Sequence, residues 1–530
     1  MPDTELELAA QRVRQLEAEA MEMHDRAQRF NKEGKFAEAQ AAYAAMHKLE
    51  DEASALAAKV GCVACVLGDD AAQKDAEPSL CNLDPNTLLP YQRLHRALPW
   101  RQQQEQQPVE HQPSAALLQS RAVAAAVGSS LADAAAMGVH WVYDLATMEQ
   151  YEAERRVAAG EQHHEASSSG ATSNLHSSGR GHPYTYGCEF MEPPRSPFYA
   201  YASGRNSPYG EQTLVLLRSL AESGGLDCGH YADTFEATFG LTSGFDGYRD
   251  VSTKGFLRNY ARAMPPPLSG ANDAQANAIA RLAPLVAAFA LGDQASGASE
   301  GGAENEQPMG LLKCVELATR VTQNTDAAVA WACAGARVLE LVLAGWRAEA
   351  AVREVVADLR SPQGQLVPYC SGPLAAELAD HLAKAHELRG VSVPEATAVL
   401  GRNCHMPNAL QTPLQVVMHV EHLVEQQRQS QGQEAPAADG GVGAGTATPG
   451  AQLPAEAYVW GVRLAVREGG CCASRAAYVG ACLGAMVAGA GTQDAAGAGA
   501  GALPADWLAK YTSGSQVKVW AEAIMAARSD

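Results

Sequence analysis

Alanine dominates the apolar residues of this 530-residue chain, and this excess most constrains what the chain can fold into. Alanine suits closely packed helices, whereas strands prefer β-branched and aromatic residues, and only 6% of the residues here are aromatic. The composition therefore predicts an all-α fold. Because 47% of the residues are apolar, the chain can bury one large core and carry an appendage.

The formal net charge of -20 argues against several partners and locations. A negative surface repels phosphate backbones, so nucleic acid is not an expected partner. Asp3, Glu5 and Glu7 stand where a signal or transit peptide would be basic or free of acidic residues. The longest weakly polar stretch, 476–491, is shorter than the roughly 20 apolar residues of a membrane span. We expect a soluble, cytoplasmic protein without membrane contact.

Residues 1–60 have helical spacing on both sides of Gly34, which supplies a turn. This region is similar to a single tetratricopeptide-type helical hairpin, whose inner face would be lined by Ala27, Phe30, Phe36, Ala39 and Tyr43. One such unit cannot bury its own apolar face. Two interpretations stay open: the hairpin packs on the main domain, or it binds a protein partner.

The rest of the chain divides by composition. Residues 61–115 are rich in Asp, Pro and Gln and are predicted to form a linker, and residues 116–530 to form the main domain. Low-complexity stretches at about 160–181, 296–307 and 426–452 are interpreted as surface insertions, because helical patterns resume after each.

Twelve cysteines are scattered without the dense spacing of a secreted disulfide scaffold, which favours a reducing compartment. Cys62 and Cys65 form one C-x-x-C without a second pair at zinc-ribbon spacing, so a structural role is favoured. His419 and His422 share a helix face but have no third ligand nearby in the sequence. Zinc is therefore not expected at either place.

Five short motifs follow one another between about residues 120 and 510. They are Gly128 to Gly138 with Asp133 inside, Tyr209-Gly210-Glu211-Gln212 before an apolar helix, Asn277 to Pro284 with Arg281, Gly469 to Ser474 before an Ala/Gly-rich helix, and Leu503-Pro504 with Trp507. In order and spacing they resemble the signatures of ADP-ribosylglycohydrolases. His140 to Asp144 and Ser474-Arg475 look closer still to the J-type crystallin branch. The resemblance implies an all-α domain of orthogonally packed helices.

The resemblance also implies a chemistry. The family's hydrolases hold the ribose of an ADP-ribosyl group with two magnesium or manganese ions while its glycosidic bond is cleaved, and such hard ions need several oxygen ligands. Position by position, Glu211 and Ser474 keep oxygen side chains, so they are the residual metal positions. Gly210, Cys471 and Ala473 replace three carboxylates. The implied cofactor is thus doubtful in this chain.

Further site residues follow from the same motifs. The catalytic candidates are Glu211, Asp133 and His140. The His140 imidazole can act as a general acid or base near neutral pH. The positions that match ligand-binding motifs are Asn277, Arg281, Gly469 and Gly470. We expect Glu211 and Ser474 to face one another across a cleft, and we expect that restoring carboxylates at 210, 471 and 473 creates metal binding if the backbone keeps the family geometry.

The cysteines near these motifs allow two other interpretations. Cys471 at a helix N-terminus would have a lowered thiol pKa if exposed, which would make it reactive. Cys471 and Cys472 with Cys404 and His405 are soft ligands of the kind zinc accepts, although neighbouring cysteines rarely ligate one ion well.

Three functions remain open from the sequence. The chain is a J-type crystallin-like protein with a degenerate metal site and weak or no hydrolysis; or an active hydrolase of an ADP-ribosyl or related glycosidic bond with an altered site; or a noncatalytic scaffold whose hairpin binds a partner. An ADP-ribose-like small molecule is the ligand that the resemblance implies.

Overall fold

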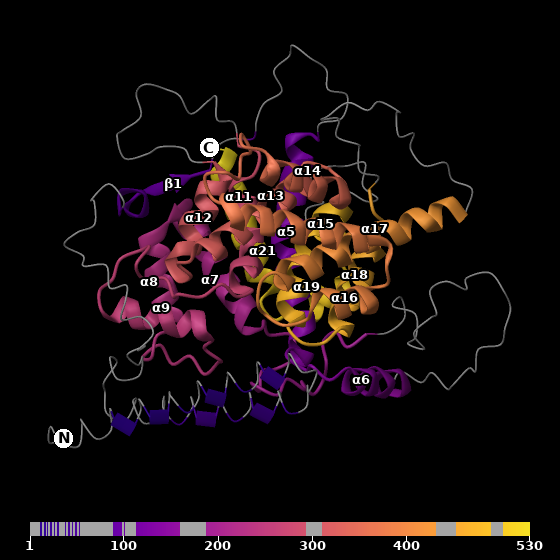
Figure 1. Cartoon of the computed structure of the whole chain (residues 1–530), viewed down its shortest axis with the longest axis horizontal. Helices are drawn as coiled ribbons and strands as arrows, with labels where there is room; N and C mark the ends of the chain where they lie inside the picture. The colour runs from indigo at the N-terminus through magenta and orange to yellow at the C-terminus, as the bar shows by residue number, and fades with distance from the viewer. Residues whose placement is uncertain are drawn as a thin grey trace, which may run out of the picture.

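The computed structural model describes residues 88–97, 100, 113–158, 187–292, 310–430, 452–488 and 502–529, together with scattered positions between 11 and 52 (Figure 1). Within these residues the chain is helical apart from one two-stranded sheet, which confirms the predicted all-α class. Two short strands, β1 (Leu94–Arg96) and β2 (Gly225–Asp227), pair antiparallel.

The helices follow in chain order. The first half of the domain contains η3 (Leu89–Gln92), α5 (Ala115–Ala136), η4 (Met137–Val139), α6 (Leu145–Ala158), α7 (Pro208–Ser223), α8 (Cys228–Phe239), α9 (Val251–Ala261), α10 (Asn277–Ala280) and α11 (Leu282–Phe289). The second half contains α12 (Leu311–Thr322), α13 (Asp326–Leu343), α14 (Ala348–Arg360), α15 (Gly372–Glu387), η5 (Leu388–Gly390), α16 (Val393–Leu400), α17 (Asn408–Ser430), α18 (Glu456–Arg467), α19 (Cys472–Val487), α20 (Ala505–Lys510) and α21 (Gly514–Ser529).

Helix α5 is the central helix of the domain, and helices α7, α11, α18, α19 and α21 contact it (Figure 1). The segment Ala115–Val139 is long and apolar enough to cross a membrane, but its apolar window is wholly buried inside the protein, as in a core helix. Helix α19 approaches α5 very closely: a Cβ on Gly480 would meet the Gly128 carbonyl oxygen at 2.4 Å. Only glycine permits this contact between two backbones.

The predicted linker, 61–115, must be corrected over residues 88–97. Strand β1 pairs with β2 through Leu94 opposite Asp227, and Tyr91 is buried in the main core. Trp100 forms an isolated bridge with Gly292, and the guanidinium of Arg528 lies 3.5 Å from the centre of its ring. These contacts join residues far apart in the sequence, which composition cannot reveal.

Two of the predicted insertions, 160–181 and 296–307, lie outside the described residues. The third, 426–452, begins too early, because α17 continues to Ser430. Arg428 Nη2 donates to the Gln452 carbonyl at 2.8 Å, which brings the two ends of the intervening segment together.

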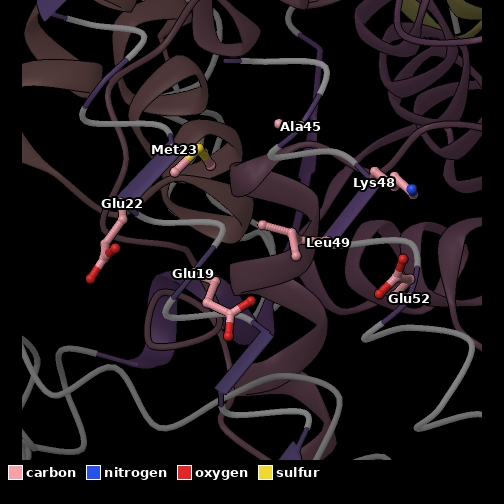
Figure 2. A pocket seen from close by; sticks show the side chains of 7 residues that line it. All are labelled: Glu19, Glu22, Met23, Ala45, Lys48, Leu49 and Glu52. Atoms are coloured by element: carbon pink, nitrogen blue, oxygen red, sulfur yellow. The ribbon is translucent and has the colours of Figure 1, made fainter. Parts of the chain in front are cut away.

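The described positions of the N-terminal region are helical. Gly34, Phe36, Ala39 and Tyr43 lie outside them, as does Ala27, so the inner face predicted for the hairpin is described only at the half-buried Phe30. One pocket brings together residues before and after the predicted turn (Figure 2): Glu19, Glu22, Met23, Ala45, Lys48, Leu49 and Glu52. The hairpin and its independence from the main domain stay predictions.

The contacts of residues 88–100 generate a test of the domain boundary. A chain that begins at Leu88 keeps Tyr91 and β1, whereas a chain that begins at Ser114 loses both. We expect the shorter chain to be less stable by at least about 2 kcal/mol, because burial of one large apolar side chain contributes about that much. Urea unfolding followed by circular dichroism measures the difference, and equal midpoints for the two chains would contradict the assignment of residues 88–100 to the main domain.

Candidate functional site

Helix α7 begins where the sequence predicted. Ser207 is its N-cap, since its Oγ accepts a hydrogen bond from the Gly210 N-H at 3.3 Å, and Pro208 occupies the first turn, where its missing N-H costs nothing. Tyr209 is buried, with 1% of its surface exposed. Residues 207–211 are therefore held rigidly at a helix N-terminus.

Asp133 on α5 anchors this helix start. Its carboxylate is fully buried and accepts hydrogen bonds from Asn206 Nδ2 at 2.9 Å, from the Ser207 N-H at 2.8 Å and from Ser207 Oγ at 2.5 Å. Burial raises the pKa of Asp133, and these hydrogen bonds oppose the shift. Both Asp133 oxygens bind the α7 N-terminus, which is a structural role, and the catalytic role that the sequence suggested stays a prediction.

The same carboxylate occupies the space beside Gly210. A Cβ on Gly210 would lie 1.9 Å from Asp133 Oδ1 and 2.8 Å from Asn206 Nδ2. No side chain fits there unless Asp133 moves. This observation argues against the expectation that restoring three carboxylates recreates a metal site, because the first of them would collide with Asp133.

Glu211 is held by two neighbours on the other side of the helix start. Arg205 Nε donates to its Oε1 at 2.6 Å, and Tyr201 Oη donates to its Oε2 at 3.1 Å. Burial raises the pKa of Glu211 to about 7, although Arg205 opposes the shift. Arg205 also lies over the Tyr201 ring, 3.9 Å from its centre, and pairs with Asp246 at 3.3 Å. Both carboxylate oxygens of Glu211 thus have protein partners.

Gly469 and Gly470 form the turn that precedes α19, with φ angles of 56° and 58° that favour glycine. A Cβ on Gly470 would meet the Arg402 carbonyl at 2.3 Å. Gly470 exchanges hydrogen bonds with the 141–142 segment: its N-H donates to Val142 O at 2.6 Å, and its carbonyl accepts from the Trp141 N-H at 2.7 Å. The two glycines make the turn that fixes the start of α19, and the ligand-binding role expected of them stays a prediction.

This turn brings His140 and Cys471 together, 331 residues apart in the chain. His140 Nε2 lies 3.7 Å from Cys471 Sγ, and its Nδ1 lies 2.8 Å from Tyr199 Oη. Ser474 Oγ is 2.9 Å from the same sulfur. Burial alone would raise the pKa of the Cys471 thiol, but the neighbouring Cys404 and His140 side chains hold it well below its usual value. The sequence indicated His140 and Cys471 separately; nothing in it indicated the pair.

Aromatic rings surround this pair. Trp141 has a φ of 66°, unusual for a bulky residue, and stacks on His140 with ring centres 4.2 Å apart. Its edges or faces meet four further rings, those of Phe198, Tyr199, Tyr209 and Tyr248. These residues belong to an apolar cluster, separate from the main core, that contains Tyr209 of α7 and Cys471 at the start of α19. The N-termini of α7 and α19 therefore meet at this cluster, and the prediction that Glu211 and Ser474 face one another across a cleft stays a prediction.

Asn277 and Arg281 lie in a buried polar network. Asn277 Nδ2 donates to Asp250 Oδ2 at 2.6 Å, and Arg281 Nη2 donates to Gln323 Oε1 at 2.7 Å. Arg281 also donates to the hydroxyls of Tyr231 and Thr322. Both side chains thus connect α10 to neighbouring segments. Protein acceptors surround the Arg281 guanidinium, and the ligand-binding role that the motif suggests for both residues stays a prediction.

The described residues at the family's metal positions do not suit a magnesium or manganese pair. Gly210 has no room for a ligand, Ala473 is a buried methyl group in the main core, and Cys471 presents sulfur. Ser474 Oγ contacts Cys471 Sγ and donates to the Cys471 carbonyl at 3.2 Å. Across the described ranges, no group of three or more His, Cys, Asp or Glu side chains could hold a metal ion, which covers the zinc arrangements considered at His419, His422, Cys404 and His405. Cys62 and Cys65 lie outside these ranges.

The raised pKa of Glu211 predicts a pH dependence of stability. The folded protein keeps this proton up to about pH 7, whereas an unfolded glutamate releases it near pH ~4.3. The contribution of Glu211 to the free energy of unfolding is therefore fully present below the pKa of the unfolded glutamate. This contribution is lost as the pH rises towards 7, by up to about 3 kcal/mol.

Denaturant unfolding between pH 4 and 8 tests this. Because Asp273 and Glu421 also have pKa values raised by burial, the informative quantity is the difference between the natural chain and Glu211→Gln. The variant should lose less stability over this range. An identical slope for both proteins would show that Glu211 titrates normally.

Comparison with known proteins shows which family this chain resembles. The model of the ADP-ribosylglycohydrolase family matches residues 114–530. Among curated proteins, crystallin J1A of Tripedalia cystophora is 27% identical over 412 residues, which cover 76% of this chain and 95% of the crystallin. Crystallin J1B of the same organism is 25% identical over 418 residues, 77% of this chain and 97% of the crystallin. A solved structure described as an ADP-ribosylglycohydrolase-related protein complex is similar over 78% of this chain and 99% of its own, with 17% identity and a TM-score of 0.44. Since the family model spans most of the chain, this protein belongs to the ADP-ribosylglycohydrolase family.

Proposed function

We propose that this chain is a J-type crystallin-like member of its family, with a degenerate metal site, that hydrolyses ADP-ribosyl glycosidic bonds weakly or not at all. The observation that carries the proposal is the contact between Asp133 and Gly210. A carboxylate that serves a metal ion in the family's hydrolases would need the space that Asp133 Oδ1 fills, 1.9 Å from the Cβ position of residue 210.

The remaining oxygen side chains support the same proposal. Glu211 is paired with Arg205 at 2.6 Å, and the positive charge of the guanidinium opposes the binding of a cation to the same carboxylate. A magnesium ion requires near-octahedral oxygen ligands and gives up its water reluctantly, so one carboxylate already paired with a guanidinium makes a poor site. Cys471 and Ala473 add no hard ligand.

The relatives favour this branch over an active enzyme with an altered site. The chain aligns with almost the full length of two proteins named as crystallins. A crystallin-like role requires a stable, soluble fold and no catalytic centre. The close approach of α19 to α5 and the hydrogen bonds of Asp133 stabilise the fold. Both lie in segments that match the catalytic motifs of the family's hydrolases.

Two assays on the full chain test the proposal. Isothermal titration with ADP-ribose, with and without magnesium or manganese, should show no effect of the metal on affinity. Release of ADP-ribose from ADP-ribosylated protein should stay near the level of the metal-free reaction, while a family member that keeps carboxylates at the positions matching 210, 471 and 473 serves as the positive control. Efficient release that depends on magnesium would refute the proposal.

Substitution of Gly210 tests the contact itself. Because the new Cβ would overlap Asp133 Oδ1, we expect Gly210→Ala to lower the free energy of unfolding by about 1–3 kcal/mol, the usual cost of overpacking, and Gly210→Asp to lower it further without creating metal binding. Gly229→Ala is the matched control, since its Cβ would meet only Asp227 Oδ1, at 3.3 Å, near the start of α8. If Gly210→Asp is as stable as the natural chain and binds manganese, the cleft has kept the family geometry.

A further inference from the structure

A surface groove of about 330 Å³ in the N-terminal region shares no residue with the candidate functional site. Three of its lining side chains are apolar, those of Met23, Ala45 and Leu49 (Figure 2). A pocket for a small molecule encloses most of the surface of its ligand. Here Ala45 is exposed, and Met23 and Leu49 are only half-buried. The groove is therefore open enough to receive side chains from another protein segment.

The apolar floor of the groove continues two packed helix faces. Leu16 lies seven residues before Met23, and Ala42 lies seven residues before Leu49, so each pair shares a helix face. Leu16 and Ala42 are 2% and 6% exposed, whereas Met23 and Leu49 are half-buried. Within the described residues, each face is thus fully covered at one member of its pair and partly open at the groove.

Carboxylates outnumber cationic groups around this floor. Glu19, Glu22 and Glu52 line the groove, and Lys48 is the cationic residue among the lining residues. Figure 2 shows the three carboxylates around the apolar side chains. Arg12 Nη1 lies 3.8 Å from Glu19 Oε1, so Glu19 is partly neutralised, while Glu22 and Glu52 are exposed. The rim of the groove is therefore negative, in a chain whose formal net charge is -20.

The charges decide between the possible occupants. A second copy of the chain would bring the same carboxylates to the groove, and like charges that face one another weaken an interface. Nucleic acid is repelled for the same reason. An amphipathic helix with a basic polar face satisfies both features of the groove, because its apolar side chains cover the floor and its lysines or arginines reach the rim.

We infer that this groove is a docking site for a basic amphipathic helix of a partner protein. The apolar face of the partner helix covers Met23, Ala45 and Leu49, and its cationic side chains pair with Glu22 and Glu52. The inference gives a chemistry to the partner that the sequence suggested for the N-terminal region. It is independent of the proposed loss of hydrolysis, because the groove contains none of the candidate site residues.

Fluorescence anisotropy with the full-length chain tests the inference. The probe is a fluorescein-labelled helical peptide of leucine and lysine, with leucine at i, i+3, i+4 and i+7, and the comparison peptide has glutamate in place of lysine. We expect the lysine peptide to bind at least about tenfold more tightly than the glutamate peptide, and more weakly as salt is added. Equal affinities, or no saturable binding of the lysine peptide, would overturn the inference.

Variants separate the groove from the general negative charge of the chain. Ala45→Gln places a longer side chain in the groove from an exposed position, and it should weaken binding of the lysine peptide by about tenfold, the equivalent of one lost apolar contact. Glu22→Gln combined with Glu52→Gln should weaken binding by about threefold to tenfold, because two surface ion pairs are lost.

The matched control is Glu377→Gln combined with Glu387→Gln on α15. It changes the net charge by the same amount, at side chains that are 62% and 65% exposed, and should leave the affinity unchanged. The inference is overturned if Ala45→Gln binds the lysine peptide as tightly as the natural chain does, or if the control pair weakens binding as much as the groove pair. Circular dichroism verifies that each variant is folded, and the comparison of the two peptides on the natural chain is decisive without any variant.

Discussion

The contact between the Asp133 carboxylate and Gly210 is the constraint on which the site depends. A buried carboxylate is costly unless it is hydrogen-bonded, and Asp133 satisfies this requirement with Ser207 and Asn206, the residues that begin α7. Tyr511 Oη donates to Asn206 Oδ1 at 2.8 Å and so adds the C-terminal part of the chain to the same network. Asp133 and Asn206 therefore fix the start of the helix that carries Glu211. The same two side chains leave no room for a ligand side chain at position 210.

Close packing of small residues positions the second segment of the site, at the start of α19. Helix α19 can lie against α5 only because Gly128, Gly480 and Gly484 let the two backbones touch. The approach sets the start of α19, where Gly469 and Gly470 turn the chain beside Val142 and Arg402. His140 then meets Cys471 at the place where two metal-binding segments converge in the family's hydrolases. A shared scaffold can thus present different chemistry once its ligand residues are replaced.

Much of this arrangement could be predicted from the sequence, for local reasons. The Ser207-Pro208 start of α7 is a short-range signal, and the alanine content indicated the helical class. What escaped prediction depends on long-range contacts. The pairing of β1 with β2, the burial of Tyr91 and the cap that Arg528 provides to the end of α11 join segments whose own composition suggests a linker or a tail. In the same way, sequence identities alone could not show that Asp133 blocks position 210 or that His140 reaches Cys471.

The most direct test of the account is an anomalous difference map from crystals of the full chain soaked in manganese, recorded near the manganese absorption edge. Such a map locates the ion without reference to any activity. The account predicts no peak between the N-termini of α7 and α19, with Asp133 still bonded to Ser207. A pair of peaks beside Glu211 and Ser474, with Asp133 displaced, would contradict it.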